Sequence, residues 1–260
     1  MPVLAIGVLL VTLFSLGGLV WLIARQEAAQ TATQQENGEV AQLSQVGPNM
    51  SWLVVGTEDV NRLISTLGLN EVQRCTRNTG VRAIYRGRKA DKSVFVTSPV
   101  HGWVLVAGVS LPQPLGASFV DKTSPLLLEL SETFGEAQYF STFPEFDHYA
   151  WFKVVNGRVV RAFATTEEGE VCNLGRVTAA EQMLGLKFFE LRGVDERTGD
   201  AGGAMLLSPT QSQVLQLAAR WSIDPTRLAD SFAQLETSTC FTATSPYHWR
   251  SERVAKNRAA

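Results

Sequence analysis

Apolar residues run without a break from Val3 to Ile23, and this run is the strongest pattern in the chain. Its 21 residues include no charged side chain, and a helix of that length rises about 30 Å, the hydrocarbon thickness of a bilayer. Only Met1 and Pro2 precede it, so the basic start of a secretory signal is missing. The pattern predicts a retained transmembrane anchor over residues 1–25, with a cleaved signal peptide as the alternative.

Residues 26–50 are rich in Gln, Ala, Thr and Glu and poor in large apolar side chains. Such a segment buries too little surface to offset the entropy lost on ordering, so we expect a flexible linker. Arg25, next to the anchor, weakly favours a cytoplasmic body, whereas the polar flank after it is easy to translocate. We expect the body to lie outside the cytoplasm.

Residues 51–247 mix helical and strand periodicity. Strand patterns occupy residues 51–56, 81–85, 93–97, 103–109, 137–141, 148–155, 158–165 and 170–173. Helical patterns with start or stop residues occupy residues 57–68, 124–135, 178–185, 208–221 and 224–235. Because strands cluster in the middle and helices gather late, the order predicts an α+β domain. We expect a mixed, mainly antiparallel β-sheet packed by several α-helices.

The pair Asn156-Gly157 between two apolar runs is a strong hairpin signal, since both residues accept the positive φ of a tight turn. A two-residue turn there places Val154 opposite Val159 and Trp151 opposite Ala162. It also assigns side chains to faces: Trp151 and Val160 to one, and Phe152, Val154 and Phe163 to the other.

Charge composition indicates which classes of partner the chain can bind. The formal net charge is −2, which argues against nucleic acid as a partner. Residues 248–260 hold four basic side chains against Glu252, so we expect a solvated basic tail, with contact to anionic lipid as the alternative.

The cysteines Cys75, Cys172 and Cys240 have neither zinc-site nor CxxC spacing. Two of them can form a disulfide outside the cytoplasm, but the sequence does not select the pair. Buried free thiols are the other interpretation.

No nucleotide-binding, metalloprotease or serine-hydrolase motif occurs, and His101, His148 and His248 have no metal-site spacing. We therefore expect no metal and no cofactor. The richest polar and aromatic cluster is FPEFDHYAW at residues 143–151, where several side chains are of the types that anchor interfaces. The candidate binding residues are Phe143, Glu145, Phe146, Asp147 and Tyr149.

Two other interpretations of this cluster stay open. His148 with Asp147 or Glu145 could serve acid–base chemistry, although neighbouring residues on a strand point to opposite faces. The cluster could also be a turn that feeds the hairpin, with the aromatic side chains in the core.

The blocks GWVLVAG (102–108), LSETFGEAQYFST (130–142), HYAWFKVVNGRVVRAFA (148–164) and WSIDPTRL (221–228) resemble a family of uncharacterised bacterial proteins in which similar blocks follow in the same order. The resemblance covers about residues 51–228. It implies an α+β bacterial domain and brings no established activity. A weaker resemblance links such domains to immunity proteins that neutralise toxins exchanged between bacteria.

Together these features predict a single-pass protein of the bacterial inner membrane, held through residues 3–23, with a periplasmic domain. Its expected function is non-enzymatic binding of a protein, either a toxin occluded by an immunity protein or another envelope protein. The alternative is an envelope hydrolase or transferase that uses His148 or His101 with a carboxylate.

Overall fold

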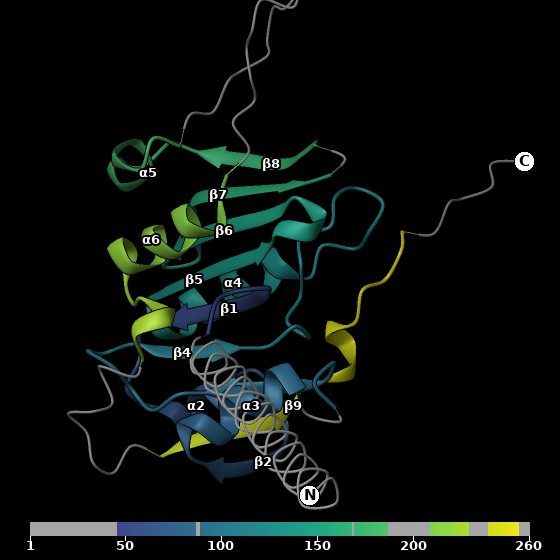
Figure 1. Cartoon of the computed structure of the whole chain (residues 1–260), viewed down its shortest axis with the longest axis vertical. Helices are drawn as coiled ribbons and strands as arrows, with labels where there is room; N and C mark the ends of the chain where they lie inside the picture. The colour runs from purple at the N-terminus through teal and green to yellow at the C-terminus, as the bar shows by residue number, and fades with distance from the viewer. Residues whose placement is uncertain (1–45, 87–88, 168, 187–208, 229–238, 255–260) are drawn as a thin grey trace, which may run out of the picture. The chain divides into compact units, whose positions relative to one another are not determined.

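The computed structural model describes residues 46–86, 89–167, 169–186, 209–228 and 239–254. They form a nine-stranded sheet with the order β2-β9-β3-β4-β1-β5-β6-β7-β8 and with every neighbouring pair antiparallel. In Figure 1 the sheet runs from β2 at the bottom to β8 at the top. The expected α+β fold with a large antiparallel sheet is confirmed.

The strands are β1 (Met50–Val55), β2 (Asn70–Cys75), β3 (Ser93–Val96), β4 (Val104–Ala107), β5 (Glu136–Phe143), β6 (His148–Val155), β7 (Arg158–Thr166), β8 (Gly169–Gly175) and β9 (Cys240–Thr244). The α-helices are α2 (Val60–Thr66), α3 (Arg77–Arg86), α4 (Thr123–Phe134), α5 (Ala179–Met183) and α6 (Gln211–Trp221). Short 3₁₀ turns are η1 (Pro144–Phe146), η2 (Pro225–Arg227) and η3 (Tyr247–Trp249).

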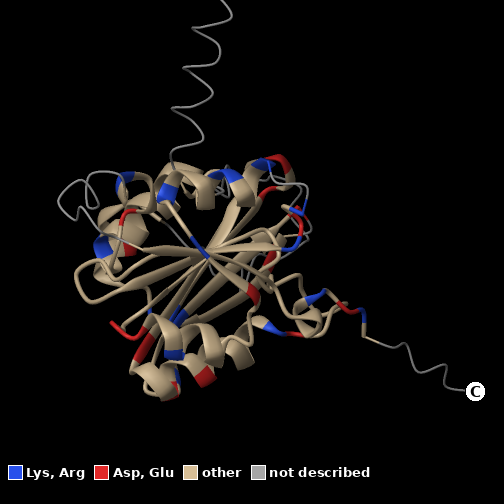
Figure 2. Cartoon of the chain, turned by 90° about the horizontal axis from the view of Figure 1, so that it is seen from below, with Lys and Arg blue, Asp and Glu red and all other residues tan. Residues whose placement is uncertain are grey.

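Helices cover both faces of the sheet, as Figure 2 shows with the strands fanned out between them. Apolar residues of α2 and α4 pack on one face, here called the α4 face. Apolar residues of α3 and α6 pack on the other, the α6 face. Successive residues of a strand alternate between faces, so β1 sends Leu53 to the α4 face and Trp52 to the α6 face. Strands β1 and β4, central in the sheet, are buried along their whole length.

One strand predicted from the pattern is wrong, and two strands of the sheet were not predicted. Residues 81–85, expected as a strand, lie in helix α3, whose Val81 and Ile84 face the core one turn apart. Gly80 lets this helix approach the sheet, since a Cβ there would overlap the Phe95 ring. Strands β2 and β9 were not expected; β2 carries mainly exposed polar residues and therefore lacks an alternating apolar pattern.

The expected helix starts are displaced by one to three residues. Asp59, and not Thr57, caps α2 through a bond from the Arg62 amide to its carboxylate. Asp121 accepts the first free amides of α4 in place of the expected Ser124 cap. Helix α6 begins after Thr210, which forms a capping box with Gln213. The expected Thr178–Glu181 capping box of α5 is confirmed.

The hairpin between β6 and β7 is confirmed, with φ of 47° at Asn156 and 71° at Gly157. Val154 lies opposite Val159 as expected. A bulge at Lys153/Val154 then shifts the register, so Trp151 lies opposite Phe163 and not Ala162. The predicted face of Phe163 is therefore wrong: it stacks on Trp151 at 4.5 Å on the α6 face.

The folded body extends beyond the expected boundaries at both ends. Val46 and Met50, assigned to the linker, are 1% and 0% exposed because they pack on the α6 face. Trp249, assigned to the solvated tail, is 4% exposed and packs on the α4 face.

None of the helices in the described ranges combines the length and apolarity needed to cross a bilayer. The expected anchor at 3–23, the rest of the expected linker and the last residues of the tail lie outside those ranges.

Candidate binding cleft

A cleft of about 960 Å³ opens on the α4 face, where β5, β6 and β7 meet two non-helical segments. Four segments far apart in the sequence form it: the loop between β4 and α4, the β5–η1–β6 corner, the end of β7, and the C-terminal segment after η3. Its lining residues are Gln113, Leu115, Ala117, Ser118, Phe119, Phe143, Phe146, His148, Thr166, Glu167, Arg253 and Val254.

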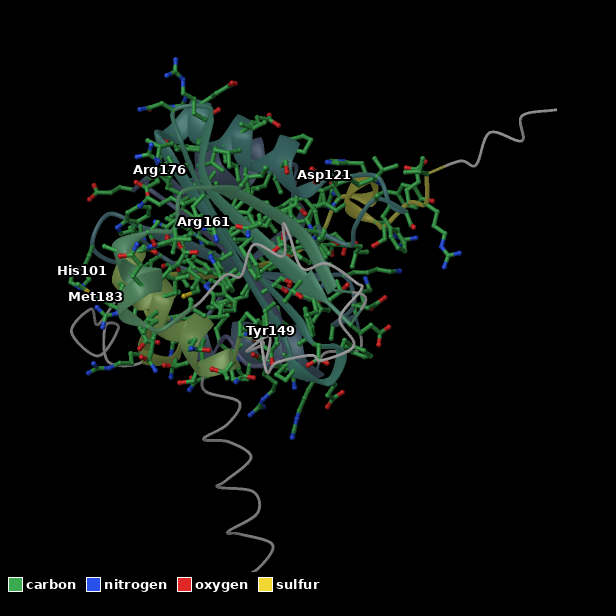
Figure 3. The ribbon with its side chains drawn as sticks, turned by 90° about the horizontal axis from the view of Figure 1, so that it is seen from above. His101, Asp121, Tyr149, Arg161, Arg176 and Met183 are labelled. Carbon is green, nitrogen blue, oxygen red and sulfur yellow. The ribbon has the colours of Figure 1, made fainter. Side chains whose placement is uncertain are left out.

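One wall consists of two strand-like segments that hold each other. The amide of Val120 donates to the Glu252 carbonyl (2.8 Å), and the amide of Val254 donates to the Ser118 carbonyl (3.0 Å). The Arg253 guanidinium lies 5.7 Å from the centre of the Phe119 ring, within cation–π range. Figure 3 labels Asp121 next to this C-terminal segment. The segment expected to be a free tail thus builds part of the cleft as far as Val254.

The floor and the opposite wall come from the β5–η1–β6 corner. Pro144 begins the 3₁₀ turn, and Asp147 leaves it with φ of +45°. The antiparallel register then pairs Phe143 with His148, so both side chains lie on the same face. Their rings meet edge-on with centroids 5.8 Å apart. Phe146 projects at the tip of the turn and is 60% exposed.

His148 is 4% exposed, and its Nε2 atom has no hydrogen-bond partner within the described part of the chain. Burial lowers the pKa of His148 to about 4, because an imidazolium is poorly solvated there. The ring is therefore neutral near pH 7. A buried polar atom without a partner is costly, and this one belongs to a residue that lines the cleft.

The geometry of the described residues gives little support to a catalytic role of His148 or His101. Within the described ranges, neither His148 nor His101 forms an ion pair or hydrogen bond with a carboxylate. His101 is exposed in a turn, and Figure 3 shows it on the opposite side of the body from Asp121 and hence from the cleft. The described residues also contain no cluster of three metal-ligating side chains.

Some of the expected binding residues line the cleft and others do not. Phe143 and Phe146 line the cleft. Glu145 and Asp147 are exposed on the corner beside it but do not line it. Tyr149 does not share this surface, because the next residue of a strand points to the other face; it is 6% exposed among the α6-face residues.

Several cleft residues escaped the sequence pattern. The sequence pattern indicates only a catalytic or a structural role for His148. Phe119, Glu167 and Arg253 stand in three unrelated stretches of the sequence, and only the folded chain brings them together. The basic composition after residue 248 was the only signal pointing to Arg253.

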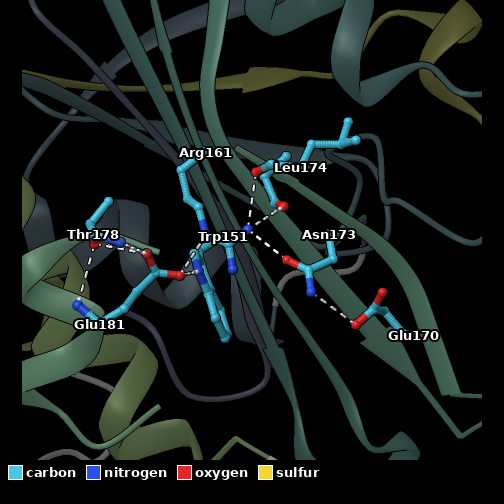
Figure 4. A network of polar contacts seen from close by, with 8 residues as sticks. Trp151, Arg161, Glu170, Asn173, Leu174, Thr178 and Glu181 are labelled. Carbon is cyan, nitrogen blue, oxygen red and sulfur yellow. Dashed lines mark hydrogen bonds and ion pairs between the residues drawn. The ribbon is translucent and has the colours of Figure 1, made fainter. Parts of the chain in front are cut away.

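A second polar cluster is buried in the α6 face and has a structural role (Figure 4). Arg161 and Glu181 are fully buried, and their Nε and Oε1 atoms lie 2.7 Å apart. Trp151 Nε1 donates to the same carboxylate oxygen at 2.8 Å. Arg161 also donates to Asn173 Oδ1 (2.7 Å) and to the Leu174 carbonyl (3.0 Å). These contacts join α5 to strands β6, β7 and β8.

Comparison of the chain with protein-family models, with curated proteins and with solved structures gave no match.

Proposed function

We propose that this chain is a membrane-tethered, non-enzymatic binding protein that holds a segment of a partner protein in the α4-face cleft. One observation carries the proposal: exposed and half-buried aromatic side chains line the same cleft as His148, whose buried Nε2 atom has no hydrogen-bond partner in the described part of the chain. Aromatic surface combined with a few polar side chains is the arrangement expected of a site that orients a ligand.

The lining indicates what kind of segment fits. Phe119, Phe143 and Phe146 offer apolar surface to an aliphatic or aromatic side chain of the partner. Because the His148 ring is neutral, a hydroxyl or amide group suits its Nε2 atom better than an ion does. Glu167 and Arg253 line the cleft with one negative and one positive charge. The cleft therefore suits a partner segment without a strong net charge.

The apolar run at residues 3–23 supports the membrane tether, and the polar flank after it supports a body outside the cytoplasm. In a bacterial inner membrane the partner would then be a periplasmic or envelope protein. Under the immunity-protein interpretation it is a toxin, and binding acts by covering the toxin's working surface.

The test begins with the full chain purified from its native membrane and with partners identified by mass. The affinity of a purified partner is then measured for wild type and for Phe146→Ala. Removal of a true anchor is expected to weaken binding about 30-fold, the equivalent of about 2 kcal/mol. Tyr247→Ala is the matched control, because Tyr247 is 79% exposed and does not line the cleft.

Equal affinities of Phe146→Ala and wild type would remove the cleft from the interaction. Turnover of a small molecule that is lost in His148→Gln, with no protein partner recovered, would replace the proposal with the hydrolase or transferase alternative.

A further inference from the structure

We propose that Cys75 and Cys240 are a disulfide-forming pair that covalently joins edge strand β2 to strand β9 under oxidising conditions. The structure describes all three cysteines as free thiols. This inference does not depend on the proposed binding function, because the pair lies outside the cleft.

The strand register places the two cysteines directly opposite each other. Gln73–Thr242, Arg74–Phe241 and Cys75–Cys240 are three successive antiparallel pairs, and the register irregularity lies before them, between Asn70 and Gln73. Directly opposed residues in antiparallel strands have Cα atoms about 4.5 or 5.5 Å apart, depending on the kind of pair. Both values lie within the roughly 4.4–6.8 Å that a disulfide spans.

The two side chains also point the same way. Directly opposed residues share a face of the sheet, and both cysteines belong to the apolar cluster of the α6 face. Cys240 is fully buried, whereas Cys75 is half-buried. Bond formation therefore needs side-chain rotation and no movement of the backbone.

Cys172 is excluded as a partner by topology. It lies in β8, at the edge of the sheet opposite to β2, with seven strand spacings between β8 and β9. At about 4.8 Å per spacing, the separation is on the order of 30 Å. The structure thus selects one pair among the three that the sequence leaves open.

The oxidant is a disulfide, either a small molecule or a protein. Cys75 is the more accessible thiol, so it loses its proton to solvent and its thiolate attacks one sulfur of the oxidant. The oxidant's S–S bond breaks, and the departing thiolate takes up a proton. The Cys240 thiolate, after losing its own proton, then attacks the Cys75 sulfur and expels the second thiolate. Two protein thiols are oxidised, and one disulfide is reduced to two thiols.

Burial raises the pKa of Cys75 to about 11 and also raises that of Cys240, so few thiolates form near pH 7. The bond is therefore expected to form slowly with small disulfides and to be resistant once formed. It would join β2, an exposed and polar edge strand, to β9, which lies near the end of the described chain. A permanent bond of this kind suits an oxidising compartment.

The test uses the full chain equilibrated with oxidised glutathione, then denatured in acid and alkylated with N-ethylmaleimide. We expect one alkylated thiol per chain, at Cys172, and a cross-linked Cys75–Cys240 peptide that dithiothreitol separates. Cys172→Ser should leave no thiol to alkylate, whereas Cys75→Ser should leave two. The oxidised wild type should melt roughly 5–10 °C above the reduced form, a difference absent in Cys75→Ser.

Oxidation of the chain in concentrated urea is the matched control. Loop closure in an unfolded chain favours the cysteines nearest in sequence, Cys172 and Cys240, so the native pair should lose its preference there. Alkylation of all three cysteines after native oxidation, or a cross-link that includes Cys172, would overturn the pairing. A cross-linked form that melts no higher than the reduced form would overturn the fastening of β2.

Discussion

Arg161 Nε lies 2.7 Å from Glu181 Oε1, and both side chains are completely buried, although β7 and α5 supply them from separate stretches of the chain. The same carboxylate has a second task. Its Oε2 atom accepts bonds from the Thr178 amide (2.6 Å) and hydroxyl (2.8 Å), which complete the capping box of α5. Glu181 therefore both caps the start of α5 and binds this helix to the sheet.

Removal of the charge at residue 181 should be severe, because the buried Arg161 guanidinium loses the carboxylate that lies 2.7 Å from its Nε atom. We expect Glu181→Gln to lower the free energy of unfolding by about 3–5 kcal/mol, measured by urea denaturation of the full chain. Glu129→Gln, an exposed change on α4, should shift it by less than about 0.5 kcal/mol. Equal effects of the two changes would show that the buried pair is dispensable.

The hairpin turn gives a backbone prediction. Gly157 has φ of +71°, and a Cβ there would lie 2.8 Å from the Glu132 side chain. We expect Gly157→Val to destabilise the body by about 1–3 kcal/mol, seen as a lower melting temperature. Asn156→Gly should be tolerated, since glycine adopts the φ of 47° without strain. An unchanged melting temperature for Gly157→Val would contradict this account.

His148 gives a pH prediction. Burial lowers the pKa of His148 to about 4, against about 6.5 in an unfolded chain. Between these values the unfolded state binds a proton and the folded state does not, so the stabilisation is complete above pH 6.5 and is lost as the pH falls toward 4. Relative to His148→Gln, wild type should lose about 2 kcal/mol of stability from pH 7 to 5. Parallel pH profiles of the two proteins in urea denaturation would disprove it.

Tyr149 tests whether a partner binds in the cleft or contacts the whole β5–η1–β6 corner. Because its ring packs on the α6 face, Tyr149→Phe should leave the affinity for a partner within about twofold of wild type, while Phe143→Ala weakens binding. Isothermal titration with the purified partner measures both. A loss of affinity in Tyr149→Phe as large as that in Phe143→Ala would mean that the partner binds across the sheet edge.

The local sequence determined those parts of the molecule that depend on neighbours along the chain. Asn156-Gly157 specified the hairpin, Thr178 with Glu181 specified the start of α5, and the apolar run at 104–107 specified a strand buried on both faces. In each case backbone conformation or a bond across a few residues sets the outcome. The antiparallel α+β class followed from the same signals.

Tertiary contacts decided the rest. The bulge after Lys153 reversed the expected face of Phe163, and a strand bulge leaves no mark in an apolar pattern. Strand β2 forms only because β9 pairs with it, and that pairing brings Cys75 to Cys240. The cleft likewise needs Phe119, His148 and Arg253 from distant segments. The local sequence determines which bonds form between residues close in the chain. Packing of remote segments determines which surfaces come into contact, because the free energy gained by burying apolar surface does not depend on separation along the chain.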